Sequence, residues 1–270
     1  MAALKTAAVA ALSLCAAQAL AESGKGSPLA EGGAWEDLRV DIVGEVEIGS
    51  ADSVLTLEAP SRAHDAATVP ILLRQIDDSV EIERATVVID ENPAPVAGEF
   101  EFSEAMHPLE FEMRVRVDRY SNVRVLADTP DGILMTGRFV KASGGCSAPA
   151  TRDPQVALST MGQMRLRLFE GQGAGMSTPR REAQIMIRHP NYSGLQRDQI
   201  TQLFVPAHFI DRLEVWQDDD LLFSMNGGIS ISENPVFRFK YDDDGSETLT
   251  VKATDTEGNS FERVLPKAET

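Results

Sequence analysis

The stretch from residue 109 to residue 117, LEFEMRVRV, decides the fold class of this chain. Apolar side chains, from Leu109 to Val117, stand at every second position, and charged side chains, from Glu110 to Arg116, fill the positions between them. Because successive side chains of a β-strand point to opposite faces, this order places one set in a core and the other in water. The stretch therefore predicts a strand of an antiparallel sheet with one buried face.

The same alternation recurs along most of the chain, most clearly at 164–168, 237–241 and 249–253. Shorter candidate strands lie at 53–58, 69–76, 83–90, 98–103, 121–127, 133–140, 183–188, 209–217, 221–225 and 260–265. Turn-forming Asn, Asp, Gly and Pro separate them at intervals of roughly 8–12 residues, which is typical of sandwiches. Only 35–43 predicts a short helix, since Trp35, Leu38 and Ile42 share one helix face. We therefore expect an all-β protein.

A change in composition divides the chain into two domains. Residues 142–162 and 170–182 are rich in small and polar residues and poor in large apolar ones. We expect a first β-sandwich domain at 22–146, a linker at 147–180 and a second β-sandwich domain at 181–270. We also expect the two domains to pack on each other.

The charge of the chain excludes one large class of partners. Its 270 residues include 25 Lys and Arg against 42 Asp and Glu, which gives a formal net charge of −17. A nucleic-acid-binding protein needs a cationic surface that displaces counterions from phosphates, so no nucleic-acid partner is expected. Two cysteines exclude a disulfide-rich scaffold and a thiolate zinc finger.

Residues 1–21 have the pattern of a signal peptide. Lys5 is followed by an apolar run, and Ala19-Leu20-Ala21 is a small-residue cleavage site. The run is short for a membrane span, so we expect cleavage after Ala21, export to the periplasm and no membrane insertion. Cleavage would remove Cys15 and leave Cys146 as the one cysteine, without an intrachain disulfide partner.

The segment KASGGCSAPA, residues 141–150, is the candidate functional element. No bulky side chain follows Lys141, and Gly144 and Gly145 give the backbone freedom next to Cys146. We therefore expect a mobile loop that exposes the thiol. The alternative, a buried cysteine that acts as a small hydrophobic residue, stays open. The segment offers no histidine as a base, which favours a carrier over a thiol enzyme.

This segment is similar to the Gly-Gly-Cys-Gly-Gly arm that ends SoxY, the carrier subunit of bacterial sulfur oxidation. The likeness extends back through SVLTLEAPSRAHDAATVPI and RVRVDRYSNVRVLADTPDG, and the later stretches VPAHFI and ENPVFRFKY resemble SoxZ, its partner subunit. The chain thus resembles the fused SoxYZ-like carriers associated with quinoprotein dehydrogenases. The resemblance implies a SoxY-like and then a SoxZ-like immunoglobulin-like sandwich, with a substrate carried covalently on Cys146. In SoxY the arm is the free C-terminus, whereas here the SoxZ-like half follows it.

The resemblance implies a periplasmic carrier without turnover of its own and without a cofactor. Its expected partners are periplasmic redox or sulfur-oxidising enzymes, including a quinoprotein dehydrogenase and its cytochrome. A second hypothesis is a non-covalent accessory protein of a quinoprotein (PQQ) alcohol dehydrogenase, for which Cys146 is dispensable. A third is a small thiol enzyme, which the lack of a second cysteine disfavours. No metal site is expected, because His189 and His208 are interpreted as structural residues.

Overall fold

The computed structural model describes residues 26–149, 154–169 and 180–267, so the predicted signal peptide lies outside the described residues. The first half contains α1 (Trp35–Val43), β1 (Ile48–Ser50), β2 (Leu55–Glu58), β3 (Val69–Gln75), β4 (Arg84–Ile89), β5 (Val96–Phe102), η1 (Glu104–Met106), β6 (Glu110–Val115), β7 (Ser121–Thr129) and β8 (Gly132–Val140). The second half contains α2 (Pro154–Ser159), β9 (Met164–Phe169), β10 (Arg180–Ile187), β11 (Ile210–Gln217), β12 (Asp220–Gly227), β13 (Val236–Asp242), β14 (Thr248–Asp255) and β15 (Ser260–Pro266).

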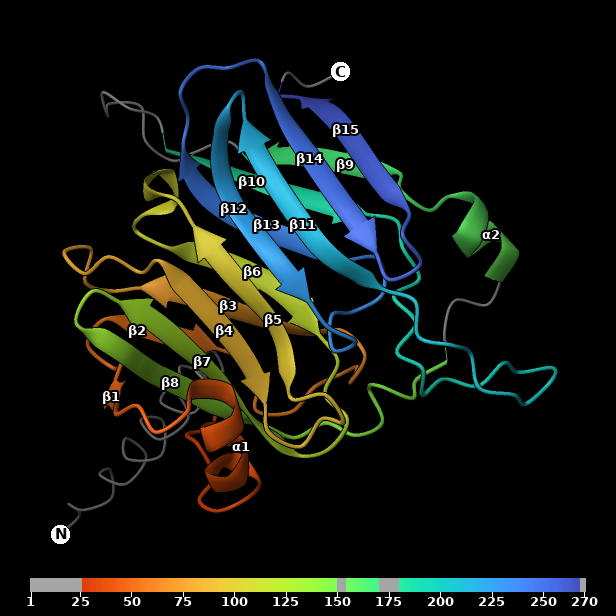
Figure 1. Ribbon diagram of the computed structural model, residues 1–270, viewed down its shortest axis with the longest axis horizontal. Coiled ribbons are helices and arrows are strands. Elements are labelled where there is room, and N and C mark those ends of the chain that lie inside the picture. The colour runs from red at the N-terminus through yellow and green to blue at the C-terminus, as the bar shows by residue number, and fades with distance from the viewer. Residues whose placement is uncertain (1–25, 150–153, 170–179, 268–270) are drawn as a thin grey trace, which may run out of the picture.

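Two sheets face each other across the core (Figure 1). The nine-stranded sheet has the order β1-β8-β7-β4-β5-β12-β11-β14-β15, and the six-stranded sheet has the order β2-β3-β6-β13-β10-β9. Neighbouring strands are antiparallel except for β1 and β8, which are parallel. The expected all-β sandwich class is confirmed.

The two halves share both sheets. β5 of the first half pairs with β12 of the second, and β6 pairs with β13. Behind these pairs, Phe111 packs edge-to-face on Phe223 with ring centroids 5.1 Å apart, and Phe223 packs likewise on Phe239. Aromatic pairs of this kind contribute about 0.5–1.5 kcal/mol beyond the area they bury. The junction between the halves is therefore part of the hydrophobic core.

The burial of the stretch at 109–117, which decided the fold class, mostly agrees with the expectation. Phe111, Met113 and Val115 in β6 are buried, and the charged residues between them in the strand are not. Arg116 is the exception, because its side chain is only 1% exposed. β6 ends at Val115, and the chain then turns towards the second half, where the backbone N–H of Arg116 donates to the carbonyl oxygen of Ser230 (2.7 Å).

Two further sequence expectations concern short segments. The predicted helix at 35–43 is confirmed as α1, which packs Trp35 against the outer face of the larger sheet. β9 lies inside the range 147–180 that the sequence predicts as a linker, and it pairs with β10 as the edge strand of the smaller sheet. The alternation at 164–168 is thus a strand of the second half.

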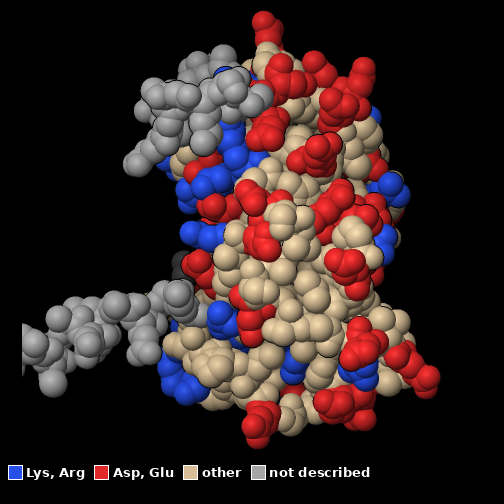
Figure 2. Space-filling model, turned by 90° about the vertical axis from the view of Figure 1, so that its left-hand side faces the viewer, with Lys and Arg blue, Asp and Glu red and all other residues tan. Residues whose placement is uncertain are grey.

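The negative charge of the chain is visible on its surface. Acidic side chains are spread across the face drawn in Figure 2, and basic side chains gather mainly along one edge of that face. Within the described ranges, no helix has the length and apolar character needed to cross a bilayer.

Candidate functional site

The chain leaves β8 and turns back on the first half at residues 143–149, which we call the cysteine loop. Its backbone hydrogen-bonds along the segment after β6. The N–H of Gly144 donates to the carbonyl oxygen of Asp118 (2.7 Å), and the N–H of Gly145 donates to that of Val117 (3.1 Å). The N–H of Cys146 donates to Oδ1 of Asp118 (3.2 Å). Three successive N–H groups therefore hold the loop to residues 117–118.

Residues 191–205 of the second half, which we call the clamp segment, hold the other side of the loop. The hydroxyl of Ser193 donates to the carbonyl oxygen of Cys146, and Nε2 of Gln196 donates to that of Ala148 (3.1 Å). Ser193 itself is buried. The cysteine loop is thus enclosed between the two halves of the chain.

Cys146 is fully buried, with 0% of its surface exposed. The expectation of an exposed thiol in a mobile loop is wrong for this structure, and the reason lies in the neighbouring glycines. A Cβ atom at Gly145 would overlap the carbonyl oxygen of Ala66 and lie 2.7 Å from the amide nitrogen of Val117. Gly144 has a left-handed backbone with φ +77°, which favours glycine. The small residues that suggested exposure let the loop pack flat on the first half.

The surroundings of Cys146 keep its thiol protonated. Burial raises the pKa of Cys146 to about 12; the Asp118 carboxylate adds to this increase, and the Arg116 guanidinium opposes it. A thiol with this pKa has almost no nucleophilic thiolate at neutral pH. The structure thus shows a buried, protonated thiol that solvent does not reach.

Arg116 brings a positive charge into the same buried region. Its Nη1 donates to the carbonyl oxygen of Ile231 (2.5 Å), whereas its Nε has no hydrogen-bond partner among the described residues. Burial lowers the pKa of Arg116, and the neighbouring Cys146 acts against this decrease. Sequence alternation had assigned Arg116 to the solvent face, so only the fold places it near the thiol.

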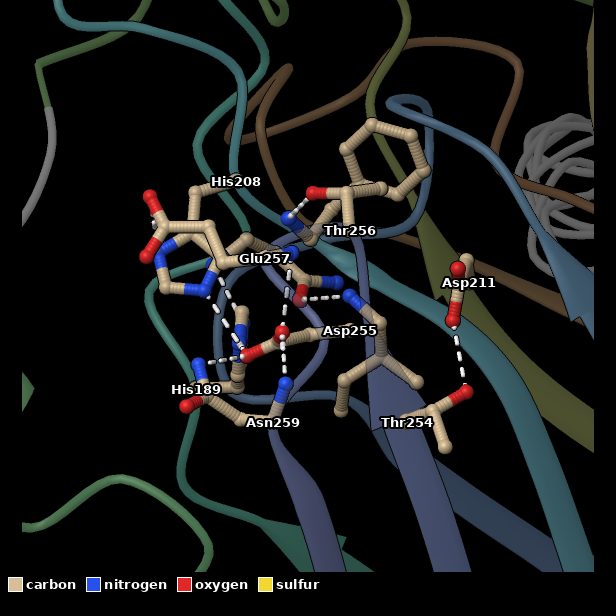
Figure 3. A network of polar contacts seen from close by, with 11 residues as sticks. His189, His208, Asp211, Thr254, Asp255, Thr256, Glu257 and Asn259 are labelled. Atoms are coloured by element: carbon tan, nitrogen blue, oxygen red, sulfur yellow. Dashed lines mark hydrogen bonds and ion pairs between the residues drawn. The ribbon is translucent and has the colours of Figure 1, made fainter.

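A second polar cluster lies in the second half and brings together two histidines that the sequence treats separately. Oδ2 of Asp255 is 3.3 Å from Nε2 of His189 and 2.8 Å from Nε2 of His208 (Figure 3). Asn259 donates to Asp255 from its backbone (2.9 Å) and its side chain (2.8 Å). Burial acts to raise the pKa of Asp255, but the bonds from Asn259, His208 and His189 outweigh it and hold this pKa at about 2.

Two imidazoles and a carboxylate are a possible metal-ligand set, and their ligand atoms lie within 4.8 Å of one another. The hydrogen bonds argue against this use. Nδ1 of His189 accepts the N–H of Asn191 (3.0 Å), so Nε2 carries the proton that is donated to Asp255. That nitrogen then has no lone pair for a metal. The cluster is better described as a hydrogen-bonded hub that joins the β14–β15 turn to His189 and His208, which flank the clamp segment.

Comparisons with known proteins assign each half of the chain to a protein family. The family profile for sulfur oxidation protein SoxY matches residues 39–146, and the profile for sulphur oxidation protein SoxZ matches residues 175–266. The SoxY match thus ends at Cys146. No curated protein matches the chain.

Solved structures give weaker likenesses. The sulfur carrier protein SoxY from Chlorobium limicola f thiosulfatophilum has 20% sequence identity and a TM-score of 0.34, and the match covers 40% of this chain and 94% of that one. A β-glycosidase from Bacteroides vulgatus has 8% identity and a TM-score of 0.25, covering 80% of this chain and 25% of that one. The tandem profile matches decide the family: this chain joins a SoxY domain to a SoxZ domain and belongs to the fused SoxYZ-like proteins of sulfur oxidation.

Proposed function

We propose that this protein is an exported carrier that binds a sulfur compound covalently through Cys146 and presents it to sulfur-oxidising enzymes. One observation carries the proposal: the SoxY match ends at Cys146, and that residue lies in a loop enclosed between the SoxY-like and SoxZ-like halves. A thiol with a pKa of about 12 is poorly suited to be the nucleophile of an enzyme in this closed form. It is suited to storage until a partner opens the loop.

The carrier works by moving the cysteine loop between two states. In the closed state five hydrogen bonds among the described residues, three to residues 117–118 and two from the clamp segment, hold the loop. When they break, Gly144 and Gly145 leave the backbone free to turn the sulfur outwards. The two glycines therefore serve both states, as close-packing residues when the loop is closed and as a flexible stem when it is open.

The compartment and the partners follow from the same proposal. The pattern of residues 1–21 supports export to the periplasm, and the partners are sulfur-oxidising enzymes in that compartment. The comparisons give no support to a quinoprotein dehydrogenase as a partner. The carrier itself performs no turnover, because loading and unloading are reactions of the partner enzymes.

Tetrathionate is a direct probe of the attachment site. When the loop opens, the thiol proton goes to solvent and the thiolate attacks an inner sulfur of tetrathionate. The central sulfur–sulfur bond breaks, thiosulfate leaves, and Cys146 keeps a thiosulfonate group. Atoms and charge balance without any further oxidant.

The test is intact-mass spectrometry of the folded protein after incubation with tetrathionate. We expect one thiosulfonate adduct on the wild-type protein, reversed by a thiol reductant, and no adduct on Cys146→Ser. Protein isolated from its native periplasm should carry a labile sulfur adduct at the same residue. The proposal fails if the native protein is found only as a clean thiol and sulfur oxidation is intact in a strain that carries Cys146→Ser.

A further inference from the structure

A small pocket lies at the outer end of the second half, away from the junction between the halves. Its volume is about 220 Å³, and it is lined by Gln163, Met164, Arg165, Met186, Arg188 and Arg263. β9 and β15, which carry Arg165 and Arg263, are the edge strands of the two sheets. Pockets for drug-sized ligands measure roughly 300–1,000 Å³, so this one suits a ligand of a few heavy atoms.

Backbone hydrogen bonds fix the floor of the pocket. The N–H of Arg188 donates to the carbonyl oxygen of Gln163 (2.8 Å), and the N–H of Gly162 donates to that of Arg188 (2.8 Å). Arg165 lies opposite Met186 in the β9–β10 ladder. The pocket therefore rests on regular, paired backbone.

The three arginines of the pocket carry charge that the described residues do not neutralise. Arg165, Arg188 and Arg263 are exposed, and none of them forms an ion pair with a carboxylate in the described ranges. Arginines elsewhere on β10 and β13 do, as in the pair of Arg238 with Glu182. Three like charges around one small pocket repel one another, and a bound anion would relieve this repulsion. The chain as a whole has a net charge of −17, so this group of unpaired positive charges contrasts with its overall negative charge.

We propose that this pocket is a non-covalent binding site for a small divalent oxyanion of sulfur. Guanidinium groups bind oxyanions through paired N–H donors, and three of them can neutralise a dianion. Met164 and Met186 line the same pocket. Their thioethers are soft and polarizable, which matches a ligand that carries a sulfur atom beside its oxygens. The choice of sulfur over other oxyanions rests on the proposed carrier function, whereas the anion site itself rests on the three arginines.

Charged side chains on edge strands also have a simpler use, because they prevent edge-to-edge pairing of sheets. This explanation covers Arg165 and Arg263. It does not cover Arg188, which follows β10, an internal strand of the smaller sheet. Protection of a sheet edge also requires no pocket. This explanation predicts that the protein self-associates when the arginines are removed.

The test is isothermal titration of the full mature chain with sodium thiosulfate and with sodium sulfate at low ionic strength. The Cys146→Ser variant is used throughout, so that covalent chemistry at the thiol cannot contribute. We expect saturable binding of at least one of the two dianions, tighter for thiosulfate if the methionines contact its terminal sulfur. Added sodium chloride should weaken the binding, because exposed charges are screened.

The variants decide the assignment. Arg165→Gln/Arg263→Gln should weaken binding at least tenfold, whereas Arg114→Gln/Arg212→Gln, which removes two exposed arginines outside the pocket, should leave it within twofold. Circular dichroism and gel filtration show whether both variants fold with the secondary structure and size of the wild-type protein or self-associate. No binding of either dianion overturns the proposal, and so does unchanged binding by the pocket variant, with or without self-association. Failure of the carrier function would appear separately, as a missing adduct on the wild-type thiol with anion binding intact.

Discussion

The clamp segment should control how fast Cys146 reacts. Its two hydrogen bonds, from Ser193 and Gln196, are among the five that close the cysteine loop in the part of the chain that the structure describes. At about 1 kcal/mol for each bond, closure is worth on the order of 5 kcal/mol, which predicts a roughly 10³–10⁴-fold protection of the thiol. Ser193→Ala/Gln196→Ala removes about 2 kcal/mol of this closure energy. The open population, and with it the reaction rate, should rise about 30-fold.

Maleimide labelling of the folded protein, followed by intact-mass spectrometry, measures this rate. The reagent is kept dilute, so that the loop opens and closes many times before each reaction and the rate reports the open population. Thr201→Ala is the matched control, since it removes a side-chain hydrogen bond to Asp198 (2.9 Å) in the same segment without reaching the loop. Its labelling rate should equal that of the wild type.

Two results would refute this reasoning. If the double variant labels at the wild-type rate, the second half does not hold the loop closed. If the wild-type protein labels as fast as the urea-unfolded chain, Cys146 is exposed in solution. A rate that simply follows global unfolding in all variants would instead identify Cys146 as a structural core residue.

Three further predictions concern single residues. Asp118→Asn should lower the pKa of Cys146 below about 12, because it removes a negative charge and keeps the Oδ1 acceptor; the pH dependence of iodoacetamide alkylation measures this. Gly145→Ala should destabilise the fold by about 1–3 kcal/mol in urea unfolding, because its methyl group overlaps Ala66. The pKa of Asp255, about 2, lies below its unfolded value of 3.8, so this residue stabilises the fold above that value and the stabilisation is lost as pH falls through about 2. Asp255→Asn should therefore lose about 2 kcal/mol at pH 6 and much less at pH 2.

The alternation of apolar and charged residues was sufficient to predict the fold class. It did not predict which side chains are buried where segments distant in sequence meet. The alternation in β6 places Phe111 and Met113 correctly, because burial on one face of a sheet has the period of the strand itself. Arg116 breaks the pattern just after the strand ends, where contacts with residues 229–231 take over. No local signal reports such contacts.

Contacts between distant segments also explain why the burial of Cys146 and the hub around Asp255 were not predicted from the sequence. Small neighbours make a segment flexible in isolation, but they equally allow close packing once a matching surface is present. For Cys146 that surface comes from Asp118 and Ser193, 28 and 47 residues away. His189 and Asp255 are 66 residues apart, so their meeting could not be inferred from spacing either.

Fusion of the two halves gives the thiol loop a property that a free C-terminal arm lacks, because β8 before the loop and β9 after it both belong to the sandwich. From Val140 to Cys146 an extended chain reaches at most about 20 Å, and it must then return, so the proposed carrier would present the sulfur to a partner at a bend of the chain. The motion that exposes the sulfur also removes it from its burial and from Asp118, the two causes that raise its pKa. Loop opening therefore gives access and reactivity in one step, and under the proposed carrier function a partner that holds the loop open raises the fraction of the thiol that can react.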